Sequence, residues 1–585
     1  MFSVDAILSQ HYPHLNLPGP ARRLLRWLLR ERDFQHFAAQ YPHLKGLDFV
    51  EQALCQLDFD YHVSDAQLEN IPAEGRVILV ANHPIGSLDG LALLRLLGRI
   101  RPDVKIVANR LLAGLTPLQS LLLPVDNLGG KTERRAIVAM GEHLAKGGAI
   151  IIFPAGEVSR LGLRGIKDGP WQGGFLKLAK RTQTPLVPIH LGARNGLGFY
   201  LGSWLNKSWA GLLLAAQLFR QQGGRMTITI GQRIPPHALE ALPAKPGAKL
   251  VREHLYRIGQ GKKGRLPTES PIALPGDRAR LKQAIEACEP LGQTPDGQRI
   301  YLYRRHEQSH SEILRELGRL REIAFRAVGE GSGRRRDLDS FDDEYHHLIL
   351  WDPTRLDIIG AYRFAPVREI LVSKGLSGLY SHTLFGFEPA LLPQLDQAIE
   401  LGRSFIQPAY WGKRGLDYLW FGIGAYLARY PDYRYLFGPV SLSGSLPPQA
   451  RDLLVSFYRQ HFAPQGPAGQ GSPAPSRHPY PATDTHFAGL DYGDALIALK
   501  SRLGNLGCAI PTLYKQYSEL CEPGGVQFMD FGIDSDFNHC IDGLVWVDVS
   551  RIKPHKRARY IDSQSLETPS IEYLRAMPAT TTTSP

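Results

Sequence analysis

Short runs of aliphatic residues alternate with helical patterns in both halves of the chain, and this alternation constrains the fold most strongly. The clearest runs in the first half are Val77–Ala81, Ala149–Phe153, Leu186–Ile189 and Met226–Ile230. Strand-length segments that alternate with helix-length segments are typical of α/β architecture. We therefore expect an α/β fold in each half.

The chain has 585 residues, which is too long for one ordinary hydrophobic core, so we expect two catalytic-sized domains. A polar stretch at Gly259–Pro271 is typical of an interdomain linker, and residues 464–483 have the Pro, Gly, Ser and Ala content of a flexible loop. The predicted division is a helical N-terminal region at 1–60, a first domain at 61–258, a linker at 259–290, a second domain at 291–565 with the flexible insert, and a disordered tail at 566–585.

The formal net charge of +12 predicts an anionic partner: nucleic acid, an acidic carrier protein or an anionic lipid surface. Five cysteines without a C-x-x-C pair argue against a disulfide framework and a structural zinc site, and fit a reducing compartment. The N-terminus lacks the pattern of a signal peptide, and the longest apolar stretches are interrupted and too short to span a bilayer. We expect a cytoplasmic protein that is soluble or lies on the inner face of the membrane.

The segment Ala21–Phe34 predicts a basic amphipathic helix. One side carries apolar residues and the other side carries arginines: Leu24, Leu25, Trp27 and Leu28 against Arg22, Arg23, Arg26 and Arg30. Such a helix can lie among anionic headgroups, but an ordinary surface helix packed on its own domain has the same pattern. Both readings stay open at this point.

The stretch Arg76–Leu94 carries the clearest chemistry of the first half. An apolar strand ends at Asn82-His83, a Pro-Gly turn follows, and Asp89 stands where a helix begins. A histidine at a strand end, with a carboxylate a few residues later, suits a general base, because the carboxylate can orient the imidazole and stabilise the imidazolium. Taken alone, the pair also fits a turn histidine beside a helix-capping aspartate.

Three further blocks favour catalysis. They are Val107–Arg110, the turn at Ile151–Arg160, and the strand Leu186–Ile189 with its internal proline. With the His83–Asp89 block, this ordered set resembles the glycerolphosphate acyltransferase family, also called the lysophospholipid acyltransferases, over roughly residues 60–235. The resemblance implies His83 as base and Asp89 as its partner. It also implies a set of groups that hold the acceptor's anionic part: Arg110, Gly156, Glu157 and Arg160.

Two positions depart from the family pattern. The spacing from His83 to Asp89 is one residue longer than the family's block, and an extra residue looped out at Gly86-Ser87 would still let the side chains meet. Glu157 stands two places after the family's glutamate position, which Ala155 occupies here. A subgroup that acts on acyl-amino acids in place of phospholipids would account for both departures.

The second half carries a different constellation. Arg321 and Phe325 lie four residues apart on one predicted helix, so they share a face. An acidic loop follows and leads into a predicted hairpin, Tyr345–Leu350 and Ile358–Phe364, and a later strand carries Glu400 and Arg403. The acidic loop contains Asp337, Asp339, Asp342, Asp343 and Glu344. Taken one at a time, such residues are more often solvated charges or surface ion pairs.

As an ordered set over roughly 295–560, these residues resemble the acyl-homoserine-lactone synthases and, more closely, the ornithine N-acyltransferases. Both are Gcn5-related (GNAT) enzymes that take acyl groups from acyl carrier protein. The resemblance implies Glu400 as the base for the acceptor amine, with Asp339 or Asp342 as alternatives, because an amine must be neutral to attack a thioester. The implied substrate-binding residues are Arg321, Phe325, Asp339, Asp342, Arg363 and Arg403.

Ester-forming and amide-forming halves in this order resemble the bifunctional ornithine lipid synthases. That resemblance implies that the second half joins a 3-hydroxyacyl chain to ornithine, and that the first half then acylates the 3-hydroxyl. It implies acyl carrier protein, ornithine and a membrane surface as partners, with no metal and no cofactor beyond the acyl-carrier co-substrate. The acidic loop favours a cationic acceptor, and no Arg-x2-Gly-x-Gly loop for CoA is found.

Three alternatives remain. The acceptor can be another amino acid, such as glycine, glutamine or lysine. The second half can be a module that only binds carrier protein beside a lysophospholipid acyltransferase. Nucleic-acid binding is the third, but zinc, helix-turn-helix and base-stacking patterns are missing from the sequence.

Overall fold

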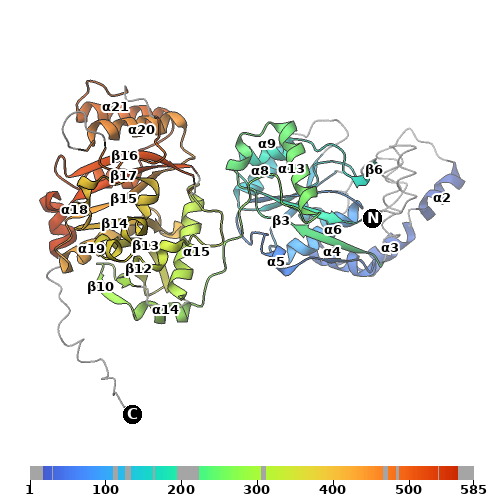
Figure 1. Cartoon of the computed structure of the whole chain (residues 1–585). Coiled ribbons are helices and arrows are strands. Elements are labelled where there is room, and N and C mark those ends of the chain that lie inside the picture. Colours follow the sequence, from blue (N-terminus) through green and yellow to red (C-terminus); the bar gives the residue numbers. More distant parts are fainter. Residues whose placement is uncertain are drawn as a thin grey trace, which may run out of the picture. The chain divides into compact units, whose positions relative to one another are not determined.

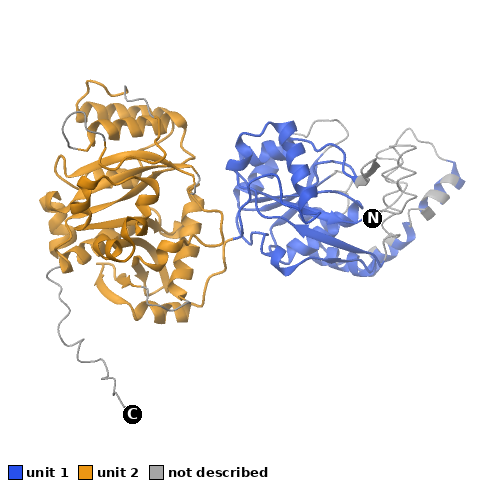
Figure 2. Ribbon diagram, viewed as in Figure 1, with its two compact units in different colours: residues 1–271 blue, residues 272–585 orange. Residues whose placement is uncertain are grey.

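The computed structural model divides into two compact units, residues 1–271 and 272–585 (Figures 1 and 2). The structure describes residues 18–28, 31–109, 116–125, 134–162, 165–193, 223–304, 311–464, 472–481, 486–535, 537 and 539–563. Each unit holds a sheet covered by helices, so the predicted α/β class is confirmed for both halves.

Unit 1 contains a seven-stranded sheet in the order β1-β9-β8-β2-β5-β3-β4. Neighbouring strands are parallel except for the antiparallel pair β8–β9. The strands are β1 (Asp60–His62), β2 (Val77–Ala81), β3 (Val104–Asn109), β4 (Leu122–Val125), β5 (Ala149–Ile152), β8 (Leu186–Gly192) and β9 (Arg225–Ile230), and a separate hairpin is formed by β6 (Arg160–Gly162) and β7 (Gly165–Lys167).

Helices cover both faces of this sheet. The fully buried strand β2 divides its side chains: Val77 and Leu79 pack with α4 and α6 on one face, while Ile78 and Val80 pack with α8, α9 and α13 on the other. A strand in the middle of a covered parallel sheet is apolar on both faces, which explains its unbroken apolar run. The helices are α2 (Gly19–Leu28), α3 (Glu31–Gln40), α4 (Gly46–Gln56), α5 (Asp65–Leu68), α6 (Ser87–Gly98), α8 (Arg134–Ala145), α9 (Gly174–Arg181), α12 (His237–Glu240) and α13 (Ala244–Ile258).

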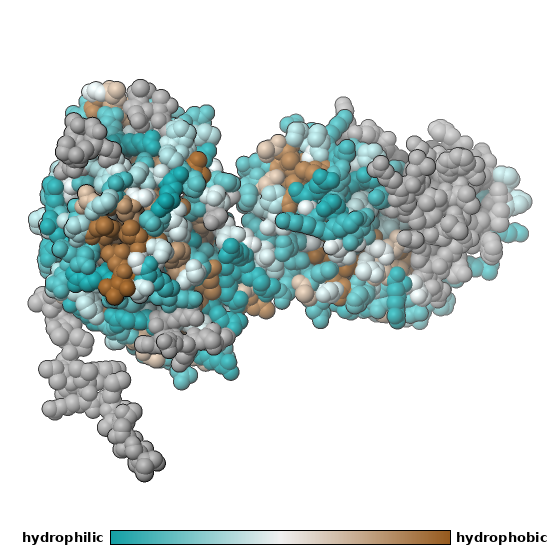
Figure 3. All heavy atoms as spheres, in the orientation of Figure 1, coloured by the Kyte–Doolittle hydropathy of each residue, from teal (hydrophilic) through white to brown (hydrophobic). Residues whose placement is uncertain are grey.

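The predicted basic amphipathic helix corresponds to α2 and the start of α3. Arg22, Arg23 and Arg26 are exposed. The side chains of Leu24, Leu25, Trp27 and Leu28, and residues 29–30, lie outside the described part. Among the helices of the described residues, none has the length and apolar character needed to cross a membrane. Figure 3 shows a largely hydrophilic surface with apolar patches on both units.

Unit 2 contains an eight-stranded sheet in the order β10-β11-β12-β13-β14-β15-β17-β16. All neighbours are antiparallel except β14–β15, which are parallel. The predicted hairpin is confirmed as β12–β13. The strands are β10 (Glu289–Gln293), β11 (Arg299–Tyr303), β12 (His346–Asp352), β13 (Asp357–Pro366), β14 (Ala398–Ile406), β15 (Tyr435–Leu442), β16 (Val526–Asp534) and β17 (Cys540–Asp548).

The parallel strands β14 and β15 are paired over a short stretch only, which begins where Ala398 lies opposite Tyr435 and ends where Glu400 lies opposite Phe437. The next residue of β15, Gly438, lies so close to β14 that a Cβ there would stand 1.9 Å from the carbonyl oxygen of Leu401. Any larger residue would collide with the backbone of Leu401. The paired part of the two strands therefore ends beside Glu400.

Two groups of helices cover this sheet. Its first face carries α14 and α15 together with α16–α18, and its second face carries α19–α22. The helices are α14 (Arg278–Glu286), α15 (Glu312–Ala327), α16 (Val367–Lys374), α17 (Tyr380–Leu384), α18 (Leu392–Leu395), α19 (Gly415–Arg429), α20 (Pro448–His461), α21 (Tyr492–Asn505), α22 (Thr512–Ser518) and α23 (Pro554–Arg557).

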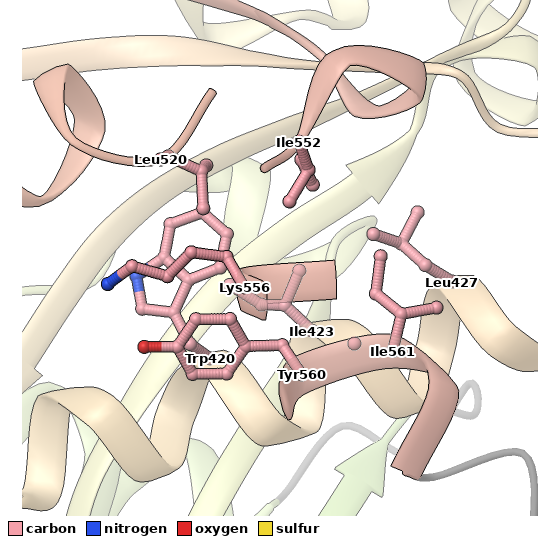
Figure 4. A pocket seen from close by; sticks show the side chains of 9 residues that line it. Trp420, Ile423, Leu427, Leu520, Ile552, Lys556, Tyr560 and Ile561 are labelled. Atoms are coloured by element: carbon pink, nitrogen blue, oxygen red, sulfur yellow. The ribbon is translucent and has the colours of Figure 1, made fainter. Parts of the chain in front are cut away.

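The C-terminal part of unit 2 packs against α19. A small pocket between them is lined by apolar and aromatic side chains, including Trp420, Leu520 and Tyr560 (Figure 4). Gly424 lets the two segments approach, because a Cβ at this position would lie 1.8 Å from the carbonyl oxygen of Tyr560. The chain from 551 to 563 is thus part of the packed unit.

Two predicted boundaries differ from the structure. The predicted linker 259–290 contains helix α14 and the first residues of β10; Asp277 caps α14 by accepting hydrogen bonds from the backbone N–H groups of Ala279 and Arg280. Within the predicted flexible insert 464–483, residues 472–481 lie against the unit, with backbone bridges from Ser476 to Phe385 and from Pro479 to Gly532. The predicted tail 566–585 lies outside the described residues.

Candidate active sites

The first site lies where β2 ends. The buried Asn82 side chain fixes this end to β8: its amide donates to the carbonyl oxygen of Leu191 (2.9 Å) and accepts from the N–H of Leu191 (2.7 Å). The next residue, His83, stacks its ring on Phe153 with a centroid separation of 4.1 Å. His83 therefore has a fixed backbone and an aromatic wall on one face.

Asp89 stands in the first turn of α6 and is fully buried. Its Oδ2 atom accepts hydrogen bonds from the N–H groups of Ile85 and Gly86, each 2.9 Å long, and lies 3.0 Å from Nδ1 of His83. Gly86 has a φ of +111°, a conformation that glycine adopts without the cost of a side chain. The predicted loop at Gly86-Ser87 thus absorbs the extra residue, and the structure brings His83 and Asp89 together.

The other residues predicted for this site are only partly placed. Gly156 is an exposed turn residue with a φ of +66°, and Glu157 is exposed with its carboxylate beside Gly169. Arg160 begins β6, but its side chain is outside the described part, as is all of Arg110. The structure therefore leaves the predicted anion-holding role of these residues as a prediction.

The second site is built on the first face of the unit 2 sheet, from α15, the acidic loop, β13 and β14. Arg321 on α15 donates from Nη2 to Oδ1 of Asp342 (2.8 Å) and is almost fully buried. Arg363 on β13 donates to Asp339, and its Nη1 also lies 3.3 Å from Oδ1 of Asp342. Arg321 from α15 and Arg363 from β13 thus meet at the buried carboxylate of Asp342.

Arg403 completes the cluster from β14. Its Nε lies 3.4 Å from Oδ2 of Asp337, and its Nη2 donates to Oδ2 of Asp339 (3.4 Å). The guanidinium also lies over the rings of Tyr380 and Phe537, 4.9 Å and 4.8 Å from their centroids. Arg403 has a φ of +47°, which an arginine adopts only when its surroundings impose it. Three arginines and three aspartates therefore form one network.

The electrostatics of this network follow from burial and pairing. Burial opposes ionisation of Asp342, but the guanidinium groups of Arg321 and Arg363 outweigh it and lower the pKa of this carboxyl. Burial, helped by Arg321, lowers the pKa of His347 to about 3, so this ring is neutral at pH 7. Asp342 is thus paired with two arginines inside the protein, although it belongs to an acidic run of the sequence.

Glu400 is buried at 1% exposure and belongs to a different hydrogen-bond group. Its Oε1 accepts from the N–H (2.6 Å) and the hydroxyl (2.5 Å) of Ser381, and its Oε2 accepts from the Tyr345 hydroxyl. Burial raises the pKa of Glu400 despite these hydrogen bonds. A carboxylate with a raised pKa is a better proton acceptor than one with a lowered pKa, so Glu400 is a better base than Asp342. Asp339, the third candidate, is paired with Arg363 and Arg403.

Phe325, the last predicted residue of this site, packs its ring edge against Phe537 at 5.2 Å. Since Phe537 also lies under Arg403, the Phe325 side chain supports the wall on which this guanidinium rests. The structure therefore places every predicted residue of the second site in one connected region.

Three further residues of this region, Tyr380, Asp534 and Asp542, are not among the site residues predicted from the sequence. Tyr380 donates from its hydroxyl to Asp534 (3.0 Å) and accepts from Arg403 (3.4 Å). Asp542 is buried nearby; burial, reinforced by the charge of Asp534, raises its pKa to about 6. The sequence holds a usable signal for Asp534, because two aspartates stand close together at the end of a strand-length run, at positions 534 and 536.

Both arrangements suit acyl transfer. An imidazole beside a buried carboxylate can accept a proton from a hydroxyl. A buried carboxylate with a raised pKa beside paired guanidinium groups can do the same for an amine, while the arginines provide donors for carboxylate or phosphate oxygens. Among the described residues, no group of three histidines, cysteines or acids is placed to hold a metal ion.

Comparison with known proteins gives a match for each unit. A family model described as "Acyltransferase" matches residues 6–257, and a model described as "Acetyltransferase (GNAT) domain" matches residues 320–421. The two matches cover the regions that hold the His83–Asp89 pair and the Arg–Asp network.

Three curated relatives illustrate the similarity. A glycine N(alpha)-acyltransferase of Bacteroides thetaiotaomicron is 30% identical over 269 residues, which is 44% of this chain and 79% of the relative. A lyso-glycine lipid O-acyltransferase of Phocaeicola vulgatus is 31% identical over 40% of this chain and 86% of its own length. An L-ornithine N(alpha)-acyltransferase of Brucella abortus is 34% identical over 151 residues, 23% of this chain and 52% of its own length.

Proposed function

Since the chain belongs to the amino-acid-lipid acyltransferases and joins their O-acyltransferase and GNAT domains in one polypeptide, we propose that it carries out both acylations of a two-chain aminolipid. Unit 2 joins a 3-hydroxyacyl chain to the amine of an amino acid. Unit 1 then joins a second acyl chain to the 3-hydroxyl. The presence of a candidate base with its partner residues in each unit is the observation that carries this proposal.

In the ester-forming step, His83 accepts the proton of the lipid hydroxyl as the oxygen attacks the acyl thioester carbon. The buried Asp89 carboxylate, 3.0 Å from Nδ1, stabilises the imidazolium that results. The imidazolium then returns the proton to the departing thiolate, so the ester and a free thiol are the products. The imidazole needs no outside reagent to return to its neutral form.

In the amide-forming step, Glu400 accepts the proton that the amine loses when it attacks the thioester carbon. The Glu400 carboxyl then returns this proton to the departing thiolate, so the products are the amide and a free thiol. Asp342 is the weaker base, because Arg321 and Arg363 lower its pKa, whereas burial raises the pKa of Glu400. Arg403, held between Asp337 and Asp339, is placed to donate to the carboxylate of the amino acid or to the phosphate of the donor's pantetheine arm.

We propose acyl carrier protein as the acyl donor of the amide-forming step. The sequence has no CoA-type phosphate loop, and a net charge of +12 favours association with an acidic protein. The exposed arginines of α2 are suited to bring the chain to an anionic membrane, where the one-chain intermediate would collect.

Ornithine is the proposed acceptor. Within the described part of the second site, acids outnumber arginines: Asp337, Asp339, Asp342, Glu400, Asp534 and Asp542 against Arg321, Arg363 and Arg403. A region with more carboxyl groups than guanidinium groups favours an acceptor with a second ammonium group. Glycine is the alternative, because the relatives that match the larger share of this chain are named for glycine.

Expression of the chain in a bacterial host without aminolipids tests this function. Lipids are extracted and analysed by mass spectrometry after growth with ¹⁵N-labelled ornithine or ¹⁵N-labelled glycine. The proposal expects a two-chain lipid that carries the ornithine label. A two-chain lipid that carries the glycine label would show that the acceptor is glycine and not ornithine. An unchanged lipid profile with folded protein would contradict the proposed activity.

A further inference from the structure

The backbone of His83 belongs to a closed ring of hydrogen bonds. Its N–H donates to Oδ1 of Asp168 (3.1 Å), and its carbonyl oxygen accepts from the N–H of Ser159 (2.7 Å). The hydroxyl of Ser159 donates to the same Oδ1 atom of Asp168 (2.5 Å), which closes the ring. Both hydrogen-bonding groups of the His83 peptide are therefore fixed by two residues that lie 76 and 85 positions further along the chain.

Asp168 is itself held on every side. It is 3% exposed, and Nε1 of the buried Trp171 donates to its Oδ2 atom (2.8 Å). Its backbone N–H donates to the Tyr256 hydroxyl (2.8 Å), and its carbonyl oxygen accepts from Arg252, both on α13. A buried carboxylate with three neutral donors is ionised at a cost, since burial raises the pKa of Asp168. The burial of this ionised carboxylate therefore lowers the stability of the fold, and its hydrogen bonds offset only part of that cost.

On the premise of the proposed ester-forming step, we propose that Asp168 is a positioning residue that holds the backbone of His83, and through it the imidazole, in place for proton transfer. The side chain of Asp168 reaches the peptide of His83, whereas Asp89 reaches its imidazole. Asn82 fixes the strand side of the same peptide through Leu191. The imidazole is thus set by contacts from three directions.

Asp168 could act through its hydrogen bonds to the His83 peptide or through its negative charge, and substitutions can distinguish these two roles. In Asp168→Asn the amide oxygen can accept the hydrogen bonds from His83 and Ser159 only if the new NH₂ group faces the indole N–H of Trp171. The opposite orientation places the NH₂ group against the N–H of His83. Either way two donors oppose each other, and the ring distorts. Trp171→Phe removes one of these donors, so the double variant can keep the ring with a neutral residue at position 168.

The test uses the purified full-length chain, with the one-chain N-(3-hydroxyacyl) amino acid that the wild type accepts and an acyl-carrier thioester. Asp168→Asn is expected to lower kcat of ester formation by about 10- to 100-fold with little change in KM for the lipid, because a displaced base slows proton transfer. Asp168→Asn with Trp171→Phe is expected to recover at least about 10-fold of this loss, and Trp171→Phe alone serves as the matched control.

The outcomes separate the alternatives. The thermal unfolding curve of each variant, compared with that of the wild type, reports whether unit 1 is folded, and amide formation by unit 2 of the same sample reports the amount of active chain. A double variant that stays as slow as Asp168→Asn would show that the negative charge matters, and would overturn the positioning role; so would a single variant with wild-type kcat. His83→Ala serves as the reference: if it leaves ester formation intact, the proposed function fails, whereas a failure confined to the Asp168 variants refutes this inference alone.

Discussion

Replacement of Asp89 by asparagine probes the first site most sharply, because it removes a charge and keeps the shape. In the wild type, Oδ2 of Asp89 accepts two backbone N–H groups of the turn and lies 3.0 Å from Nδ1 of His83. The amide oxygen of asparagine can keep both N–H contacts, so the turn and the start of α6 retain their cap. The imidazolium loses its negatively charged neighbour.

The size of the effect follows from this distance. Two unit charges 3.0 Å apart interact by about 5 kcal/mol at an effective dielectric constant of about 20. Loss of that stabilisation from the transition state corresponds to roughly a 10³- to 10⁴-fold lower kcat. The same substitution in a Ser-His-Asp triad lowers kcat by about 10⁴-fold. We expect Asp89→Asn to lower ester formation by about 10³-fold or more.

The assay supplies the one-chain amide and an acyl thioester to the purified variant and follows the two-chain product by mass spectrometry. Amide formation by the same sample should stay within about twofold of the wild type, since Asp89 lies in the other unit. An Asp89→Asn chain that keeps more than about a tenth of its ester-forming kcat would refute the view that Asp89 stabilises the imidazolium.

Three further predictions concern unit 2. Glu400→Gln should lower amide formation by at least about 100-fold and leave ester formation on supplied one-chain lipid unchanged; equal rates in variant and wild type would remove Glu400 as the base. Folding raises the pKa of Asp542 from 3.8 to about 6, so the stability that this carboxyl contributes is complete below about pH 4 and is lost as the pH rises through about 6. Asp542→Asn should therefore stabilise the chain against urea by up to about 3 kcal/mol at pH 7 and by little at pH 4, and a variant less stable than wild type at pH 7 would contradict this account. Gly424→Ala should destabilise the packing of the C-terminal segment by about 1–3 kcal/mol or more, because its Cβ would stand 1.8 Å from the carbonyl oxygen of Tyr560; an unchanged melting temperature would show that the segment moves away freely.

The sequence was sufficient to predict the structure where the site residues and the elements that carry them lie close together in the chain. The strand Val77–Ala81 and the helix that starts after Gly86 lie within a few residues of each other, so hydropathy and turn residues predict both elements and the turn between them. The pairing of His83 with Asp89 was implied by the family resemblance. The same holds for α15, where the four-residue spacing of Arg321 and Phe325 predicts that they share a face of one helix.

Contacts between residues that lie far apart in the sequence could not be predicted from local sequence patterns. Glu400 takes its hydrogen bonds from Ser381 and Tyr345, which lie 19 and 55 positions away, and nothing local distinguishes these hydroxyls from others. The role of the acidic loop was predicted as a site for a cationic side chain, yet Asp337, Asp339 and Asp342 are paired with arginines of α15, β13 and β14. Which arginine meets which aspartate depends on the register of the sheet, which the sequence alone does not give.

The predicted linker failed for a different reason. Residues 278–286 lie beyond the polar stretch Gly259–Pro271 from which the linker was predicted. The local signals of a helix were nevertheless present, since Asp277 is an N-cap and Leu281 and Ile285 are spaced four residues apart. Capping and spacing were the better guides in this segment.

The lipid profile of a host that expresses the His83→Ala chain tests the central claim most directly. If one polypeptide forms the amide first and the ester second, the His83→Ala chain can form the amide but not the ester. The account predicts that the two-chain aminolipid disappears and that its one-chain N-(3-hydroxyacyl) precursor accumulates in its place. Continued formation of the two-chain lipid by this variant would contradict the account.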